Sequence, residues 1–336
     1  MSRHTPFSSA PTAALALIVS AALVLATTFF SIRYGVRDIT VLDAWQALLG
    51  HTDTPAQAAA AARIPRTVLG LLVGAALAVS GTCFQAVTRN PLADPGIFGI
   101  LSGAALAVAV SYAFLHTLSA SSTILAAITG AALASAAVYA IGTLGGASPL
   151  KLALAGAVIA AACSSLTTAI LLPRSHVMDS FRLWQIGGIG GAQWDRILAA
   201  LPLMAIGFAL CWVLASAMNA LALGDATATA LGHRVGLVRA GSFTGAVLLA
   251  GTATALAGPI AFVGLIIPHM YRLTTGVDHR VLIPLSALGG GALLVAADTV
   301  GRIIAKPEEI AVGVLLPVLG APLFLWLIRT NKVKEL

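Results

Sequence analysis

The amino-acid sequence predicts an all-α polytopic membrane protein with about ten transmembrane helices, in a single domain over residues 1–336. The chain is 59% hydrophobic and only 9% charged, whereas about a quarter of the residues in soluble domains are charged. Apolar runs of roughly 18 residues or more, long enough to cross a bilayer, recur along the chain. Glycine is abundant, with 33 residues, and small residues let transmembrane helices approach closely.

The apolar runs define the expected spans, and the polar insertions between them are short. The first run follows Arg3 and could pass for a signal peptide, but so many later spans favour an uncleaved first helix. The longest polar insertions are 32–62, 173–195 and 219–237. The expected spans lie at 12–31, 64–88, 96–116, 122–143, 152–172, 196–218, 238–257, 280–300 and 311–329, with a shorter one at 260–271.

The stretch TRNPLADPGIFG (88–99) interrupts two apolar runs. Asn90 precedes Pro91, and a residue before proline is pushed out of the α region, so the preceding helix is expected to stop there. Asp94 before Pro95 is a typical helix start, because the carboxylate can cap free N–H groups and proline suits the first helical position. The stretch therefore predicts a tight turn between antiparallel spans, with Arg89 at the lipid–water boundary.

The net charge of +7 does not indicate nucleic-acid binding. The basic residues lie singly at the ends of apolar runs, without clusters or interleaved aromatics, a pattern typical of interfacial anchors. With a cytoplasmic N-terminus and ten spans, they divide almost evenly between the two sides, so the positive-inside rule does not settle the orientation. The outer side would still carry unusually many arginines, which suggests a role for positive charge there.

The sequence contains none of the common catalytic or metal-binding patterns. Glycine is never followed by lysine, so the chain has no P-loop and cannot be its own ATPase. It has no H-E-x-x-H, no G-x-S-x-G and no Cys/His cluster. Cys83, Cys163 and Cys211 lie inside apolar runs and are expected to be packing residues. We expect no catalytic residue, metal or cofactor, which leaves an intramembrane enzyme without support.

Asp298 is the one acid inside an otherwise apolar run. A charged group at the centre of a membrane helix costs roughly 2.5–3.5 kcal/mol on insertion scales. Arg302 lies four residues later on the same helical face, which suits an ion pair. One interpretation is a structural pair between Asp298 and Arg302. The other is an ion-coupling carboxylate, as in a secondary transporter.

Two polar insertions suggest short helices outside the spans. The glycine run 187–191 between Trp184 and Trp194 would weaken a helix, while the tryptophans suit the membrane interface, so a short or broken interfacial helix is expected. In 219–237, Asp225 is expected to cap a short helix that ends at Gly232. Such a helix is either a connector or a docking element for a soluble partner.

Several stretches, in order from about residue 60, resemble the FecCD-type permeases of ABC importers for ferric siderophores, haem and cobalamin. The stretches are RIPRTVLGLLVGAALAVSG (63–81), QAVTRNPLADPGIFGI (85–100), LALAG (152–156), FRLWQIGGIGGAQW (181–194), ALGDATATALG (222–232), GPIAFVGLIIPHMYR (258–272), DHRVLIP (278–284), AADTVGR (296–302) and VGVLLPVLGAPLFLWL (312–327).

The resemblance implies a type II ABC importer permease fold in the cytoplasmic (inner) membrane, with both termini cytoplasmic. It implies three protein partners: separate ATPase subunits below, a periplasmic or lipid-anchored substrate-binding protein above, and a second permease copy or homologue alongside. The permease itself is surrounded by membrane lipid. The segment 32–62 would then be an outer loop. Arg63, Arg66 and Arg302 match arginines that face acidic side chains of the binding protein, and such charge-assisted pairs favour fast docking.

The resemblance also assigns residues to coupling, gating and the translocation path. The segment 219–237 would form cytoplasmic coupling helices, with Asp225, Leu231 and Gly232 transmitting motion from the ATPase. Small polar residues on the span 152–172 would line the path, although they also serve helix packing. The inner gate is assigned to Ser148, Pro149 and Leu150, and the path to Ser164, Ser165, Thr167 and Thr168.

The sequence departs from the family pattern at two places. Many members have Glu-Leu-Pro-Val-Gly before the last span, whereas this chain reads Glu309-Ile310-Ala311-Val312-Gly313 without that proline. Pro149 and Leu150 replace paired hydroxyls at the gate. The stretch 181–194 and the tail GAPLFLWLIRTNKVKEL are closer to siderophore members, so a ferric siderophore is the expected cargo, with haem or cobalamin as alternatives. The ion-coupled secondary transporter using Asp298 remains the competing hypothesis from another class.

Overall fold

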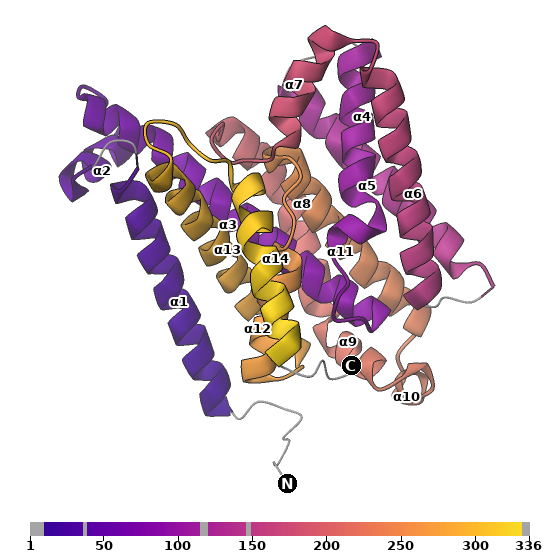
Figure 1. The fold of residues 1–336 in the computed structure, drawn as a ribbon. Helices are drawn as coiled ribbons and strands as arrows, with labels where there is room; N and C mark the ends of the chain where they lie inside the picture. The colour runs from indigo at the N-terminus through magenta and orange to yellow at the C-terminus, as the bar shows by residue number, and fades with distance from the viewer. Residues whose placement is uncertain (1–9, 36–38, 115–119, 146–148, 331–336) are drawn as a thin grey trace.

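A computed structural model describes residues 10–35, 39–114, 120–145 and 149–330. Within these ranges the elements are all helical (Figure 1). In chain order they are α1 (Ala10–Arg33), α2 (Val41–Leu48), α3 (Pro55–Thr88), the 3₁₀ turn η1 (Pro95–Phe98), α4 (Ile100–Phe114), α5 (Ala120–Thr143), α6 (Pro149–Leu171), α7 (Ser175–Gln185), α8 (Trp194–Val213), α9 (Ala215–Ala222), α10 (Asp225–Ala230), α11 (Val235–Ala257), α12 (Val263–Thr275), α13 (His279–Ile304) and α14 (Val312–Thr330).

Seven of these helices are long and apolar enough to cross a membrane: α1, α3, α5, α6, α8, α11 and α13. The other three expected spans are helices too, but shorter ones. The helices α4 and α14 are apolar, and α12 has only 13 residues. The α12 run is short because the backbone is non-helical from Gly258 to Phe262, where Phe262 adopts a left-handed conformation with φ 71°.

The central element is α3, which packs against α13, α11 and α12 and also contacts α1, α2, α8 and α9. Its seam with α13 is built on glycines. A Cβ placed on Gly74 would strike the carbonyl of Gly290, and a Cβ on Gly290 would strike the carbonyl of Gly74. The absence of side chains at both positions therefore lets the two backbones touch, as expected for small residues in membrane helix pairs.

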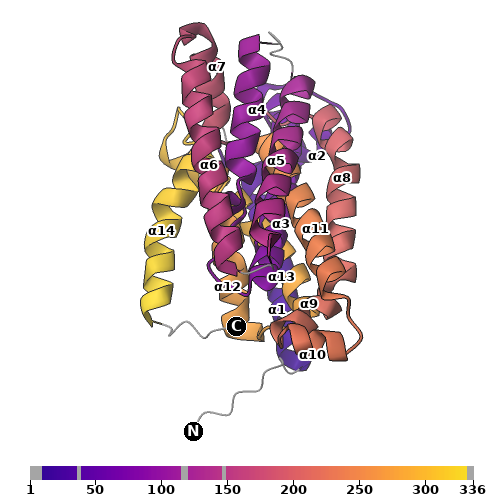
Figure 2. The ribbon, with the colours of Figure 1, turned by 90° about the vertical axis from the view of Figure 1, so that its right-hand side faces the viewer.

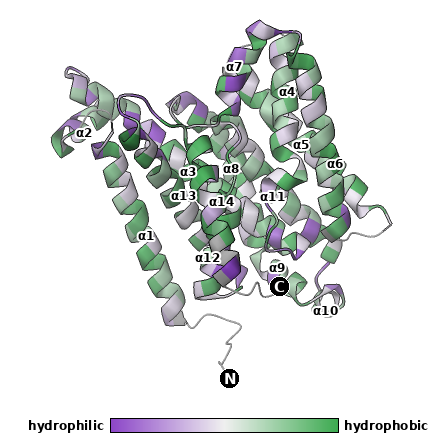
Figure 3. Ribbon diagram, viewed as in Figure 1, coloured by the Kyte–Doolittle hydropathy of each residue, from purple (hydrophilic) through white to green (hydrophobic). Residues whose placement is uncertain are grey.

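Two groups of helices flank this centre. The helices α4, α5 and α6 pack on one another and reach α3 mainly through α11, and Figure 2 shows α4, α5 and α6 side by side. On the opposite side, α1 packs mainly on α13 and exposes apolar side chains such as Leu15, Ile18 and Leu25. In Figure 3 the helix shafts are mostly hydrophobic, while hydrophilic residues gather toward the ends of the bundle.

The two ends of the bundle differ. One end carries α9 and α10, together with the start of α1 and the end of α14, and we call it the α9–α10 end (Figure 1). The other end carries α2, α7 and the connection 305–311 between α13 and α14, and we call it the α2–α7 end (Figure 1).

The segment 32–62, which is expected to be an outer loop, contains helical turns, and its position outside the membrane stays a prediction. It contains α2 and the first turns of α3. Each helix begins with a capping box: Thr40 with Asp43 for α2, and Thr54 with Gln57 for α3. Pro55 occupies the first turn of α3, where its missing N–H is not needed. The expected start of the span 64–88 is too late, because the first turns of α3 are polar at their beginning.

Candidate docking and coupling sites

At the α2–α7 end, Arg66 lies at the centre of a charged cluster. Its Nε donates to Asp298 Oδ2 at 2.9 Å and its Nη2 donates to Asp298 Oδ1 at 2.8 Å. Its Nη1 donates to Glu309 Oε2 at 2.7 Å. The guanidinium of Arg66, on α3, is thus held by one carboxylate from α13 and one from the connection 305–311. Bidentate arginine–carboxylate pairs of this kind are among the stronger polar contacts in proteins.

Arg302 shares the same carboxylate from the other side. Its Nε lies 3.1 Å from Asp298 Oδ2, so the ion pair expected from the four-residue spacing is present. Arg302 is only 1% exposed and also donates to the carbonyl and the hydroxyl of Ser31, at 3.1 and 2.8 Å. The buried Asp298 is therefore the common counter-ion of two arginines, and its second partner, Arg66, was missed by the sequence argument.

Arg63 also points into the protein. Its Nη1 donates to the carbonyls of Ile32 and Arg33, at 3.1 and 3.4 Å, which ties α3 to the end of α1. The structure therefore brings Arg63, Arg66 and Arg302 together at one end, but turns Arg63 and Arg302 toward internal acceptors. Arg66 has a partner on the surface, because Glu309 is 38% exposed. Docking through these arginines stays a prediction.

At the α9–α10 end, Asp225 is held by two arginines from other elements. Arg89, which ends α3 in a left-handed conformation, forms an ion pair with Asp225 and donates from Nε to the carbonyl of Leu221 at 2.8 Å. Arg239 of α11 forms a second pair with Asp225 at 2.9 Å. These contacts connect α10 to both α3 and α11.

The expectation that Asp225 caps a helix is wrong. Asp225 is the first residue of α10, the cap position belongs to Gly224, and no side chain caps this end. The carboxylate is instead used by the two arginines. The helix ends at Ala230, and Gly232 beyond it has φ 85°, a conformation that glycine adopts without strain. Leu231 is 60% exposed, so a large apolar side chain stands on the surface of this end.

The turn at 88–99 lies next to this end, and its stop-and-restart geometry is as expected. Asn90 Oδ1 accepts from the N–H of Leu92 at 2.9 Å, and Asp94 Oδ1 accepts from the N–H of Gly96 at 2.8 Å. Asp94 therefore caps η1 before α4 begins. Burial raises the pKa of Asp94, and the hydrogen bond from Gly96 acts in the opposite direction.

The residues assigned to the gate and the path lie on α6 or just before it. Ser148 is outside the described residues, Pro149 is the first residue of α6, and Leu150 is exposed. Ser164, Ser165 and Thr168 lie on the exposed side of α6. The one member of the set that does not share this side is the buried Thr167, whose hydroxyl donates to the Cys163 carbonyl at 2.8 Å.

The glycine run 187–191 follows the short helix α7, as expected from the sequence. It forms a loop that joins three parts of the chain. The N–H of Gly188 donates to the carbonyl of Ala257 at 2.7 Å, and the N–H of Gly313 donates to the carbonyl of Gly187 at 3.1 Å. A Cβ on Gly187 would strike the carbonyl of Pro259, so this close approach requires glycine. The loop therefore fixes the start of α14 against the end of α11.

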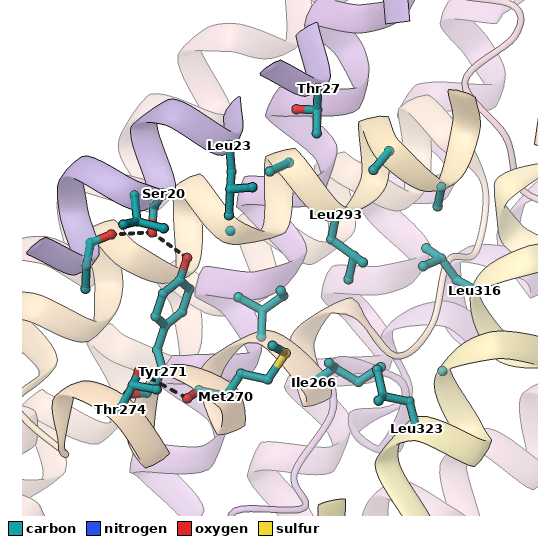
Figure 4. A pocket seen from close by; sticks show the side chains of 18 of the residues that line it. Ser20, Leu23, Thr27, Ile266, Met270, Tyr271, Thr274, Leu293, Leu316 and Leu323 are labelled. Carbon is teal, nitrogen blue, oxygen red and sulfur yellow. Dashed lines mark hydrogen bonds between the residues drawn. The ribbon is translucent and has the colours of Figure 1, made fainter. Parts of the chain in front are cut away.

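A cavity of about 850 Å³ lies between α1, α12, α13 and α14 (Figure 4). Its wall is almost entirely apolar, with Leu23, Leu293 and Leu316 among the labelled side chains. Its hydroxyls are used internally, since Ser20 and Tyr271 bond to each other at 2.6 Å. The wall therefore offers no free polar group for a chelated metal. Within the described residues, no three His, Cys, Asp or Glu side chains converge as a metal site would require.

Comparison with known proteins shows which family this chain resembles. The FecCD transport family matches residues 23–330. The chain is 40% identical over 324 residues to the iron(3+)-hydroxamate import system permease protein FhuB of Bacillus subtilis. This match covers 95% of this chain and 84% of that protein. It is 42% identical over 270 residues to the ferric enterobactin permease protein FepD of Escherichia coli, covering 80% of each chain. It is 41% identical over 275 residues to the cobalamin import permease protein BtuC of Halobacterium salinarum, covering 82% of this chain and 74% of that protein.

A solved structure supports the same conclusion. An inward-facing metal-chelate type ABC transporter superposes with a TM-score of 0.83 at 26% identity, covering 95% of this chain and all of that one. These matches are to ABC importer permeases, which are transport subunits and not enzymes, rather than to ion-coupled secondary transporters. Asp298 is a buried counter-ion of two arginines. With seven long apolar helices in the described residues, the protein is a multi-pass protein of the cytoplasmic membrane. The fold, the ordered motifs and these relatives together establish that the chain belongs to the FecCD transport family of ABC importer permeases.

Proposed function

We propose that this permease carries a ferric siderophore across the cytoplasmic membrane. The observation that carries the proposal is the 40% identity to an iron(3+)-hydroxamate permease over 95% of the chain. The cobalamin and haemin permeases are similarly identical, at 41% and 39%, but over 82% and 80% of the chain. A cobalamin or haem cargo is therefore the second candidate.

In the proposed mechanism, the path forms between this chain and a second permease copy or homologue. The exposed side of α6, with Ser164, Ser165 and Thr168, supports this role because it presents small polar groups away from the core. Leu154, Val158 and Leu166 of α6 are exposed as well, and residues 152–172 include no charged side chain. An uncharged wall has little fixed attraction for cargo, so a bulky chelate can pass without being trapped. Pro149 and Leu150, at the start of α6, are assigned to the inner gate of this path.

The energy comes from a separate ATPase that docks at the α9–α10 end. The exposed Leu231 supports this docking, because apolar side chains on a surface mark contact sites when they gather there. Leu223 and Leu237 are exposed in the same segment. Asp225 then passes the motion of α10 to α3 and α11 through its ion pairs with Arg89 and Arg239. Gly232 allows the turn that ends this coupling segment.

A substrate-binding protein docks at the α2–α7 end. The support is the cluster of Arg63, Arg66 and Arg302 at that end, which resembles the docking arginines of the family. Acidic groups on the binding protein would be attracted to this positive charge, which speeds association and makes it sensitive to salt. Arg66 can meet an acidic partner through the surface now covered by Glu309.

The cargo is tested by uptake into proteoliposomes that contain the whole importer and its binding protein. Radioactive iron supplied as a hydroxamate, catecholate or citrate chelate is compared with haem and with cobalamin. We expect saturable uptake of one ferric chelate and no uptake of haem or cobalamin. Uptake of cobalamin or haem in preference to every ferric chelate would replace the proposed cargo by the second candidate.

A further inference from the structure

The guanidinium of Arg66 is divided between an inner and an outer carboxylate. Its Nε and Nη2 are fixed by Asp298, which is 2% exposed and is also paired with Arg302. This inner pair orients the plane of the guanidinium. The remaining Nη1 donates to Glu309, which is the surface-exposed member of the cluster. An acidic group that approaches from outside would therefore meet Arg66 at the position that Glu309 already occupies.

The two carboxylates are held with very different strength. Asp298 is buried between two arginines, and removing one partner from a buried ion pair leaves an uncompensated charge. Glu309 lies at the surface, where an ion pair is solvated and weak. Glu309 belongs to the connection 305–311 rather than to a helix, so the displacement of its side chain does not require a helix to unfold. The outer contact is thus the one that can exchange.

We propose that Glu309 is an internal competitor for Arg66, and that an acidic side chain of the substrate-binding protein takes its place on docking. The inference rests on the proposed docking at the α2–α7 end and adds a residue to it that the family resemblance does not assign. Docking is then an exchange of one carboxylate for another on a fixed guanidinium. The binding protein meets the arginine only in the fraction of molecules in which Glu309 has moved away, so its apparent affinity is reduced by that fraction.

The exchange has a structural consequence for α14. Glu309 lies three residues before Val312, the first residue of α14, so its contact with Arg66 holds the start of α14 against α3. The same region is also held by Gly313, which donates to the Gly187 carbonyl. The N–H of Ile310 also donates to the carbonyl of Gly301 at 3.3 Å. Displacing Glu309 removes one of these attachments. Docking at the surface would thereby loosen the N-terminal end of α14.

The chain provides a matched pair of variants, Glu309→Gln and Glu308→Gln. Both remove one negative charge from neighbouring exposed positions, but no ion pair or hydrogen bond is described for Glu308. The whole importer is placed in nanodiscs, and the dissociation constant of its binding protein is measured over a range of salt concentrations. We expect Glu309→Gln to tighten binding about two- to five-fold relative to Glu308→Gln, as the loss of a surface ion pair allows. Equal constants for the two variants, or weaker binding by Glu309→Gln, would overturn the inference.

A second measurement does not depend on any change to the permease core. The acidic residues on the binding protein's docking surface are changed one at a time to the corresponding amide. The gain from Glu309→Gln should disappear with one of them, the residue that replaces Glu309. Persistence of the gain with every such variant would show that no carboxylate is exchanged. If the binding protein associates without any dependence on salt or on its own acidic residues, the proposed docking itself fails, which is a different result from equal binding by the two permease variants.

Discussion

Asp298 illustrates how much of this molecule depends on single polar residues in an apolar setting. It is almost fully buried and is the shared counter-ion of Arg66 and Arg302. The sequence predicted the pair with Arg302, because four residues on a helix place two side chains on one face. It could not predict Arg66, which is 232 residues away and is brought close only by the packing of α3 on α13. Long-range partners of this kind leave no trace in the spacing of one sequence.

The buried cluster predicts a large effect of Asp298→Asn on stability. The variant leaves the guanidinium groups of Arg66 and Arg302 close together with one buried negative charge removed. Breaking a buried ion pair typically costs about 3–5 kcal/mol, so the thermal unfolding midpoint in detergent should fall clearly. Glu309→Gln is the control, because it removes a carboxylate from the exposed side of the same arginine and should change stability by less than about 1 kcal/mol. A similar small shift for both variants would contradict this account.

Asp225 leads to the opposite prediction, an effect on transport with little effect on stability. Its pairs with Arg89 and Arg239 are exposed, and exposed pairs contribute about 0–1 kcal/mol. Asp225→Ala should therefore fold normally and bind the ATPase, but lower the rate of ATP-dependent uptake several-fold because α10 is no longer linked to α3. Asp179→Ala, which removes an exposed pair with Arg182 at the other end, is the control and should transport normally. Normal uptake by Asp225→Ala would show that these pairs do not transmit motion.

At the scale of helices, the apolar pattern of the sequence predicts where the helices lie, but the polar residues at their boundaries do not predict where the helices begin. Each apolar run contains a helix, because a helix satisfies its backbone hydrogen bonds internally where lipid offers none. The first turns of α3 and the whole of α2 fall within the expected outer loop 32–62, because no apolar run long enough to span a membrane covers them. Their capping boxes, Thr40 with Asp43 and Thr54 with Gln57, were the signal available in the sequence. The shortness of α12 depends on Phe262, whose left-handed backbone no pattern indicates.

The seam between α3 and α13 predicts opposite outcomes for two glycine-to-alanine changes. Gly290→Ala adds a methyl group against the Gly74 carbonyl and the Ala78 side chain, so the helices must move apart and the protein should lose stability. Overpacking of this kind typically costs about 1–3 kcal/mol. Gly236→Ala in α11 has no heavy atom near the new Cβ and should stabilise the helix by up to about 1 kcal/mol. Unfolding midpoints of the two variants, measured in the same detergent, check this; a shift in the same direction for both would contradict it.

At the scale of the whole molecule, the residues that we propose for docking and coupling lie at the two ends of the bundle. The α9–α10 end carries the exposed Leu231 and the paired Asp225, while the α2–α7 end carries the arginine cluster. The long helix α3 connects the two, since Arg66 lies near its start and Arg89 closes its end. The family resemblance predicts a role for both ends, and the contacts that join each end to α3 are seen only in the structure.

The central claim is that this permease moves cargo only when a separate ATPase drives its α9–α10 end. It is tested most directly by uptake of the ferric chelate into proteoliposomes containing the permease and binding protein, with and without the ATPase and ATP. We predict uptake only when both the ATPase and ATP are present, and no uptake driven by a proton gradient alone. Uptake by the permease without the ATPase would contradict this account.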